Sequence, residues 1–173
     1  MFQELYGNAM RIRKERPADY QAIRQVTELA FQGKEYAGGD EQDVIDRLRS
    51  TNALTLSYVA IANETIVGHV AFSPAAAEDR SAPWFALGPV SVLPERQRKG
   101  IGSALICNGL SELEKTGALG CILTGAPTFY RKFGFELKPE HAPAKEPKEY
   151  FMVKLFTSFE PTGAFCFHSA FYG

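Results

Sequence analysis

The chain has 173 residues and a formal net charge of −1 at pH 7, with 45% hydrophobic and 23% charged residues. This length suits one domain, residues 1–173, with a sizeable apolar core, and the balanced charge argues against a nucleic-acid partner. No apolar run approaches the roughly 20 residues that span a bilayer, and the first residues carry neither a basic leader nor an apolar signal core. We therefore expect a cytoplasmic protein with no membrane partner.

The N-terminal half alternates between strand and helix patterns. We predict, in order, a strand at 10–14, a helix at 17–32, a helix after residue 40, and strands at 55–62 and 65–73. Pro17 is suited to open the first helix, Asp40 to cap the second, and the Asn-Glu pair at 63–64 to turn between the two strands.

The C-terminal half begins the same way and then becomes rich in strands. We predict a strand at 84–93, a helix at 101–115, a strand at 118–124, a short helix at 128–132, and strands at 133–137, 150–156 and 163–171. This order predicts an α/β protein (an α+β mixed sheet) with helices on both faces. The three cysteines form no Cys-x-x-Cys pair, so we expect no metal site.

Gly88 and Pro89 interrupt an otherwise strongly apolar strand at 84–93. Proline has no N–H to donate to a sheet ladder, so a fully paired central strand should exclude it. A buried strand that bulges, or that splays from its neighbour, reconciles the two facts. An edge strand with a kink is the alternative.

A basic turn and two glycines open the helix at 101–115. A helix start leaves about four backbone N–H groups without intrahelical partners and carries the positive end of the macrodipole. Gly100 and Gly102 permit close approach, while Arg96, Arg98 and Lys99 add positive charge. These features predict a site for a phosphorylated ligand, most of all a pyrophosphate.

The spacing excludes two common phosphate loops. Lys99 precedes Gly100, whereas a P-loop has its lysine after the last glycine. Leu105 stands where a dinucleotide-binding fingerprint has its third glycine, and residues 94–99 separate the strand from the glycines. Nicotinamide and flavin dinucleotides are therefore not the expected ligands.

A third pattern, Gln/Arg-x-x-Gly-x-Gly/Ala, is matched by Gln-Arg-Lys-Gly-Ile-Gly at 97–102, and Tyr-x-x-x-Gly-Phe by residues 130–135. With Gly-His-Val-Ala-Phe-Ser-Pro at 68–74 and Leu-Gly-Pro at 87–89, the chain resembles the GNAT superfamily of N-acetyltransferases. The resemblance extends to a bacterial branch of small, mostly uncharacterised members. One departure is Ala126, where that branch often has aspartate.

The resemblance implies the GNAT fold: about seven strands with flanking helices, splayed between the fourth and fifth strands, where the pantetheine arm of acetyl-coenzyme A inserts. Acetyl-CoA is then the implied co-substrate, held largely by backbone groups, and no metal is implied. The implied cofactor-binding residues are Val90, Ser91, Val92, Gln97, Arg98, Lys99, Gly100, Ile101, Gly102 and Ser103.

The implied reaction transfers the acetyl group to a primary amine of a small molecule, peptide or protein by direct attack in a ternary complex. Tyr130 is the implied general acid. A phenol titrates at about 10 and a thiol at about 8.5, so the phenol can hydrogen-bond to the departing sulfur and pass it a proton without being ionised beforehand. The alternative is that Tyr130 only packs with Phe129 and Phe133.

The general base is not identified. His69 is a candidate base or substrate contact, and its alternative is a hydrogen-bonded structural residue in the strand at 65–73. Two other functions stay open: a non-catalytic acyl-CoA sensor or scaffold with this fold, and a transferase that uses a longer acyl-CoA. A homodimer also stays open.

Overall fold

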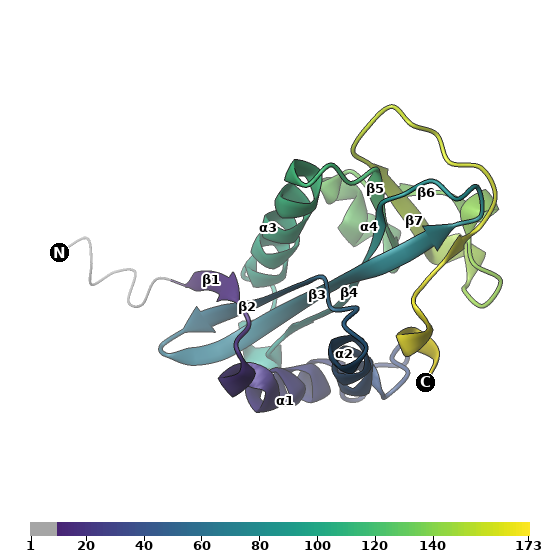
Figure 1. Cartoon of the computed structure of the whole chain (residues 1–173). Coiled ribbons are helices and arrows are strands. Elements are labelled where there is room, and N and C mark those ends of the chain that lie inside the picture. The colour runs from purple at the N-terminus through teal and green to yellow at the C-terminus, as the bar shows by residue number, and fades with distance from the viewer. Residues whose placement is uncertain (1–9) are drawn as a thin grey trace.

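Helices cover both faces of one mixed sheet in the computed structural model, which describes residues 10–173 (Figure 1). The expectation about a leader concerns residues 1–9 and lies outside the described residues. The strands are β1 (Arg11–Lys14), β2 (Leu56–Ala62), β3 (Thr65–Ala77), β4 (Trp84–Val92), β5 (Gly120–Thr124), β6 (Glu136–Leu137), β7 (Phe151–Leu155) and β8 (Phe165–Cys166). The α-helices are α1 (Tyr20–Phe31), α2 (Glu41–Ser50), α3 (Ile101–Lys115) and α4 (Pro127–Tyr130).

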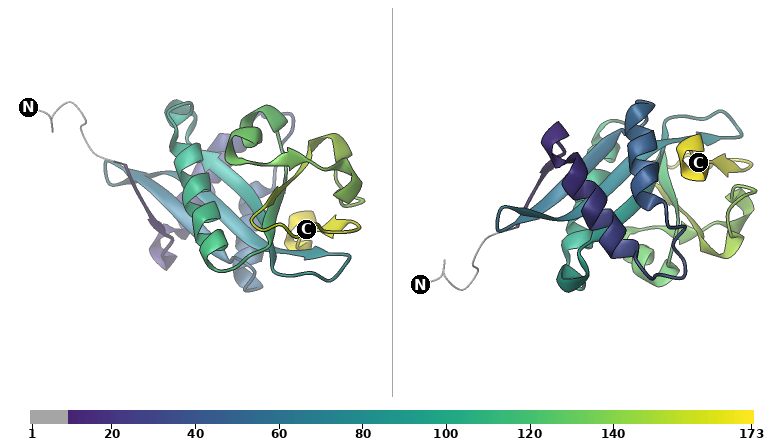
Figure 2. Two further views of the ribbon diagram at one scale, coloured as in Figure 1. Left: turned by 90° about the horizontal axis from the view of Figure 1, so that it is seen from above. Right: turned by 90° about the horizontal axis from the view of Figure 1, so that it is seen from below.

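The sheet runs in the order β1-β2-β3-β4-β5-β7-β6, and its strands are antiparallel to their neighbours except for the parallel pair β4 and β5. Helices α1 and α2 lie on one face and α3 lies on the other (Figure 2). The mixed sheet with helices on both faces confirms the predicted fold class. No helix within residues 10–173 is long and apolar enough to cross a bilayer.

Buried apolar side chains hold the helices against the sheet. Ile23 of α1 and Ile45 of α2 form one cluster with Val59 of β2. On the opposite face, Leu105 of α3 is fully buried in the main core. Burying such a side chain contributes about 1.5–3 kcal/mol to stability. Gly109 lets α3 come close, because a Cβ there would collide with the ring of Phe72 on β3.

Strand β4 bulges and splays at the glycine-proline step, as predicted. On the β3 side, Val70 pairs with Val90 and Phe72 with Leu87, so residues 88 and 89 stand opposite a single residue of β3. On the β5 side, the ladder runs from Trp84 to Ala86 and stops there. The second half of β4 therefore has β3 on one side and a gap on the other.

The C-terminal strand predictions were too long. The predicted strand at 163–171 is a two-residue pairing of β8 with the end of β3, followed by a 3-10 turn, Ser169–Tyr172. That turn bends away to pack on α2, where Arg47 Nε donates to the carbonyl of Ala170 at 2.8 Å. The predicted strand at 133–137 also shortens to β6, because Gly134 ends the preceding turn with a φ of +92°.

Candidate active site

A cavity of about 590 Å³ brings together the loop predicted to bind phosphate, the splayed half of β4 and the segment that carries Tyr130. Its walls come from the end of α1, the loop after α1, β4, the start of α3, and α4. The lining residues are Ala30, Phe31, Tyr36, Val90, Val92, Arg96, Gln97, Arg98, Gly100, Ile101, Gly102, Ser103, Phe129, Tyr130 and Lys132.

The loop between β4 and α3 is tied back to the end of the strand. Gln97 Nε2 donates to the carbonyl of Val92 at 2.9 Å, and the Leu93 N–H donates to the carbonyl of Val67 on β3 at 2.9 Å. Arg98 adopts a left-handed φ of +61°, an uncommon conformation for a residue with a side chain. The implied ligand contact Gln97 thus also orders the loop, a task that its sequence position does not reveal.

Gly100 and Gly102 are glycines for different physical reasons. Gly100 has a φ of +83°, which other residues rarely adopt, although a Cβ there would meet open space. Gly102 has no such φ, and a Cβ on it would make only an ordinary 3.7 Å contact with Val92. The fold therefore requires Gly100, whereas the missing side chain at Gly102 serves to leave the cavity open beside the free N–H groups of the helix start.

The backbone of β4 presents its polar groups to the gap. In an antiparallel ladder, alternate residues bond to the same neighbour. Because the Leu93 N–H bonds to β3, the N–H groups of Val90 and Val92 point away from β3, toward the side from which β5 has parted. The Val92 carbonyl also points away from β3, since Gln97 binds it. The amide groups of an inserted ligand can form hydrogen bonds with these unpaired backbone groups of β4.

Ser91 and Lys99 differ from the other implied cofactor residues. The Ser91 side chain is buried and points to α1, where its Oγ lies 3.3 Å from Oγ1 of Thr27. Lys99 is exposed at the surface, while the other eight implied residues line the cavity. Strand alternation explains Ser91: Val90 and Val92 face the cavity, and the residue between them faces the opposite side.

Tyr130 lies in the cavity with its ring packed among aromatic side chains. Its ring centroid is 4.9 Å from that of Phe129 and 6.1 Å from that of Phe135, both edge-on. Burial, and to a lesser degree the neighbouring Tyr36, raises the pKa of Tyr130 to about 12. The phenol therefore stays protonated at neutral pH and can donate a hydrogen bond. Both the aromatic packing and the cavity position are present, so the two alternatives for Tyr130 do not exclude each other.

His69 lies on β3 in the interior of the protein. Its side chain is fully buried, and Nε2 lies 2.7 Å from Oγ of Ser57 on β2. Nδ1 has no hydrogen-bond partner within residues 10–173. Burial, with a smaller contribution from the charge of Arg49, lowers the pKa of His69 to about 3. This position favours the structural alternative, and a role in catalysis stays a prediction without geometric support.

The sequence did not point to several residues of the cavity wall. Phe31 and Tyr36 come from the end of α1 and the following loop, which carry no phosphate or acetyl-transfer motif. Phe129 and Lys132 flank Tyr130, and the Lys132 ammonium lies 4.1 Å from the centroid of the Phe129 ring. Proximity to a motif residue was the available signal for these two, and no signal in the sequence pointed to Phe31.

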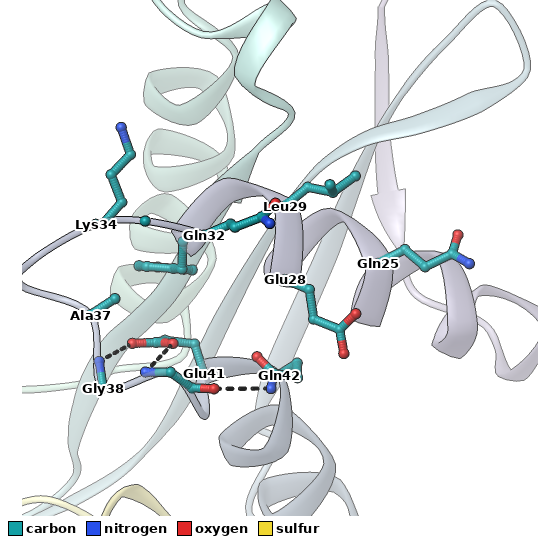
Figure 3. Close-up of a pocket in the computed structure, with 12 residues that line it drawn as sticks. Gln25, Glu28, Leu29, Gln32, Lys34, Ala37, Gly38, Glu41 and Gln42 are labelled. Atoms are coloured by element: carbon teal, nitrogen blue, oxygen red, sulfur yellow. Dashed lines mark hydrogen bonds between the residues drawn. The ribbon is translucent and has the colours of Figure 1, made fainter.

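A second hollow, of about 710 Å³, lies beside the end of α1 and the loop that leads to α2 (Figure 3). Two of its polar side chains bind the backbone of the loop. The Glu41 carboxylate accepts from the N–H groups of Gly38 and Gly39 at 2.6 and 3.2 Å, and Gln42 Nε2 donates to the Gly39 carbonyl at 3.2 Å. These bonds brace the loop that carries Tyr36.

The comparisons with known proteins agree with this geometry. Residues 11–138 match the family model for the acetyltransferase (GNAT) domain. An uncharacterised N-acetyltransferase of Escherichia coli K12, YhbS, is 31% identical over 133 residues, which cover 76% of this chain and 77% of that protein. The chain belongs to the GNAT family of acetyltransferases.

Two crystal structures provide matches over almost the whole chain. One is a GNAT family acetyltransferase from Brucella melitensis in complex with acetyl-CoA, with 44% identity, a TM-score of 0.84, and 95% and 99% of the two chains covered. The other is YhbS from E. coli in complex with CoA, with 26% identity, a TM-score of 0.87, and 96% and 93% covered.

Proposed function

We propose that this protein transfers the acetyl group of acetyl-CoA to a primary amine of a small molecule, peptide or protein by direct attack in a ternary complex. The observation that carries the proposal is the single cavity that joins a basic helix start, the unpaired side of β4 and the phenol of Tyr130. The Brucella melitensis protein, 44% identical, was crystallised with acetyl-CoA.

The basic end of the cavity would hold the diphosphate. The N–H groups at the start of α3 favour an anion, and the side chains of Arg96 and Arg98 line the same end. The pantetheine amides would then pair with the main chain of Val90 and Val92 along the gap. The Val92 N–H is suited to polarise the thioester carbonyl as a single oxyanion donor.

The chemical step would proceed as follows. The neutral amine nitrogen attacks the thioester carbonyl carbon, the C–S bond breaks, and the thiolate takes a proton from Tyr130 Oη. The nitrogen loses its extra proton to water, from which Tyr130 is reprotonated. Because its pKa is about 12, the Tyr130 phenol carries its proton at neutral pH and can donate it to the sulfur as the C–S bond breaks.

A thiol-release assay with an amine panel and acetyl-, propionyl- and succinyl-CoA tests the proposal, after calorimetry has established that acetyl-CoA binds. We expect binding and turnover with at least one amine, fastest with the acetyl donor. Tight binding with no acylated amine in the panel would favour the sensor. Faster turnover with succinyl-CoA would favour the longer-acyl transferase.

A further inference from the structure

Gly125 lies between β5 and α4, immediately before the segment that carries Tyr130. Its N–H donates to the carbonyl of Tyr150 at 3.0 Å, which holds the backbone in place. Its φ lies outside the left-handed region, so backbone conformation gives no reason for a glycine here. The reason must be space.

The Tyr130 ring occupies that space. A Cβ built on Gly125 would lie 2.5 Å from Cε2 and 3.0 Å from Cδ2 of Tyr130, and 3.3 Å from Cδ1 of Leu123. Carbon atoms normally approach to about 3.5–4.0 Å. Any side chain at Gly125 therefore displaces the ring of Tyr130 by about 1 Å unless the backbone moves.

The surroundings direct that displacement into the cavity. Phe129, Phe133 and Phe135 pack around the ring at centroid distances of 4.9, 6.4 and 6.1 Å. The Tyr130 N–H is bound to the carbonyl of Ala126 at 3.1 Å, which limits movement of the short helix. The open side of the ring is the cavity, where the thioester sulfur is expected.

We infer that Gly125 is a positioning residue for acetyl transfer. Because Gly125 has no side chain, the Tyr130 ring packs directly against its Cα, and this contact sets where the phenol hydroxyl meets the leaving sulfur. The inference rests on the proposed function, in which Tyr130 protonates the thiolate. A displacement of about 1 Å in a reacting group can lower a rate by about a hundredfold.

The test compares Gly125→Ala, Tyr130→Phe and the double variant, with Ala126→Ser as the control. Ala126 is exposed in the same turn, and a serine there adds a hydroxyl while keeping the backbone carbonyl that binds the Tyr130 N–H. We expect Gly125→Ala to lower kcat 10- to 100-fold while the calorimetric Kd for acetyl-CoA changes less than threefold. Ala126→Ser should keep kcat within twofold of wild type.

The double variant distinguishes positioning from general damage. If Gly125 acts through the Tyr130 hydroxyl, Gly125→Ala should change kcat less than twofold in the Tyr130→Phe background. Multiplied effects of the two changes, or a wild-type kcat for Gly125→Ala, would overturn the inference. A wild-type kcat for Tyr130→Phe would overturn both the role of Tyr130 as acid and the role of Gly125 in positioning it. If the wild type itself shows no turnover, the proposed function is rejected, and this result is distinct from a failure of the Gly125 inference.

A second variant covers the case in which Gly125→Ala unfolds. Phe129→Leu removes an aromatic neighbour whose ring centroid lies 4.9 Å from that of Tyr130, and so loosens the ring without touching Gly125. If ring position governs turnover, Phe129→Leu should lower kcat at least fivefold alone and less than twofold in the Tyr130→Phe background. Equal losses in both backgrounds would contradict the inference.

Discussion

The two ends of the cavity are built in different ways. The proposed phosphate end comes from one continuous segment, residues 96–103, and it offers backbone N–H groups and basic side chains to a ligand. The proposed transfer end combines Phe31 and Tyr36 from α1 and its following loop, the edge of β4, and Tyr130 from α4. A short sequence motif can therefore encode the phosphate end. The transfer end forms only when separate helices and strands pack together.

The difference also concerns how each end tolerates change. At the phosphate end, a side chain on Gly102 would not clash with the protein, so a substitution there should change ligand binding and leave the fold intact. At the transfer end, Tyr130 is held by neighbours from several segments, so small changes in packing should affect the rate. The following predictions test this contrast, from the largest expected effect to the smallest.

Gly102→Glu should abolish detectable acetyl-CoA binding in calorimetry. It places a carboxylate where the diphosphate is expected, beside the start of α3. Because a Cβ at this position meets only Val92 at 3.7 Å, the melting temperature should change little. Asn108→Glu, an added charge on the exposed face of α3, is the control and should bind normally. Wild-type affinity for Gly102→Glu would place the phosphates elsewhere.

Tyr130→Phe should lower kcat at least tenfold with an unchanged Kd for acetyl-CoA. The ring and its aromatic packing remain, and only the proton donor is removed. Since burial raises the pKa of Tyr130 to about 12, wild-type kcat should show no loss from phenol ionisation between pH 7 and 10. Tyr150→Phe, at a half-exposed position, is the control. If Tyr130→Phe has the same kcat as wild type, Tyr130 contributes packing only and no proton.

Arg98→Ala should weaken acetyl-CoA binding about tenfold, since a charged hydrogen bond to phosphate contributes about 1.5–3 kcal/mol. Lys99→Ala is the matched control: it removes the neighbouring charge, which lies outside the cavity wall, and should change Kd less than threefold. Added salt should reduce the difference in Kd between wild type and Arg98→Ala, because salt screens exposed charges. If both variants lose the same affinity for acetyl-CoA, the overall positive charge of the loop attracts the ligand, and Arg98 makes no specific contact with a phosphate.

His69 should affect stability more than the reaction. Its folded pKa, about 3, lies below the ordinary value of 6.5, so the unfolded chain binds the extra proton as the pH falls. The neutral buried ring thus contributes fully above pH 6.5, and about 2 kcal/mol of unfolding free energy should be lost between pH 7.5 and 5. Denaturant titrations of wild type and His69→Gln at both pH values measure this.

The same variant tests the catalytic hypothesis for His69. In the folded protein, His69→Gln should keep kcat within threefold of wild type and leave its pH profile unchanged, because the ring lies away from the cavity wall. A large loss of kcat with intact folding would return His69 to the mechanism.

The sequence alone determined what depends on neighbouring residues. The glycines at 100 and 102 with their basic turn predicted the helix start, and Pro89 predicted the break in β4, because φ restrictions and a missing N–H act within a few residues. Periodicity likewise placed α3 at Ile101–Lys115.

Only the tertiary structure decided what depends on distant contacts. It turned Ser91 toward α1, buried His69 against Ser57, and brought Phe31 and Tyr36 into the cavity that Tyr130 lines. It also shortened the C-terminal strand, because docking on α2 competed with strand pairing. Burial and orientation are properties of the packed sheet, and residues that are far apart in the chain set them together.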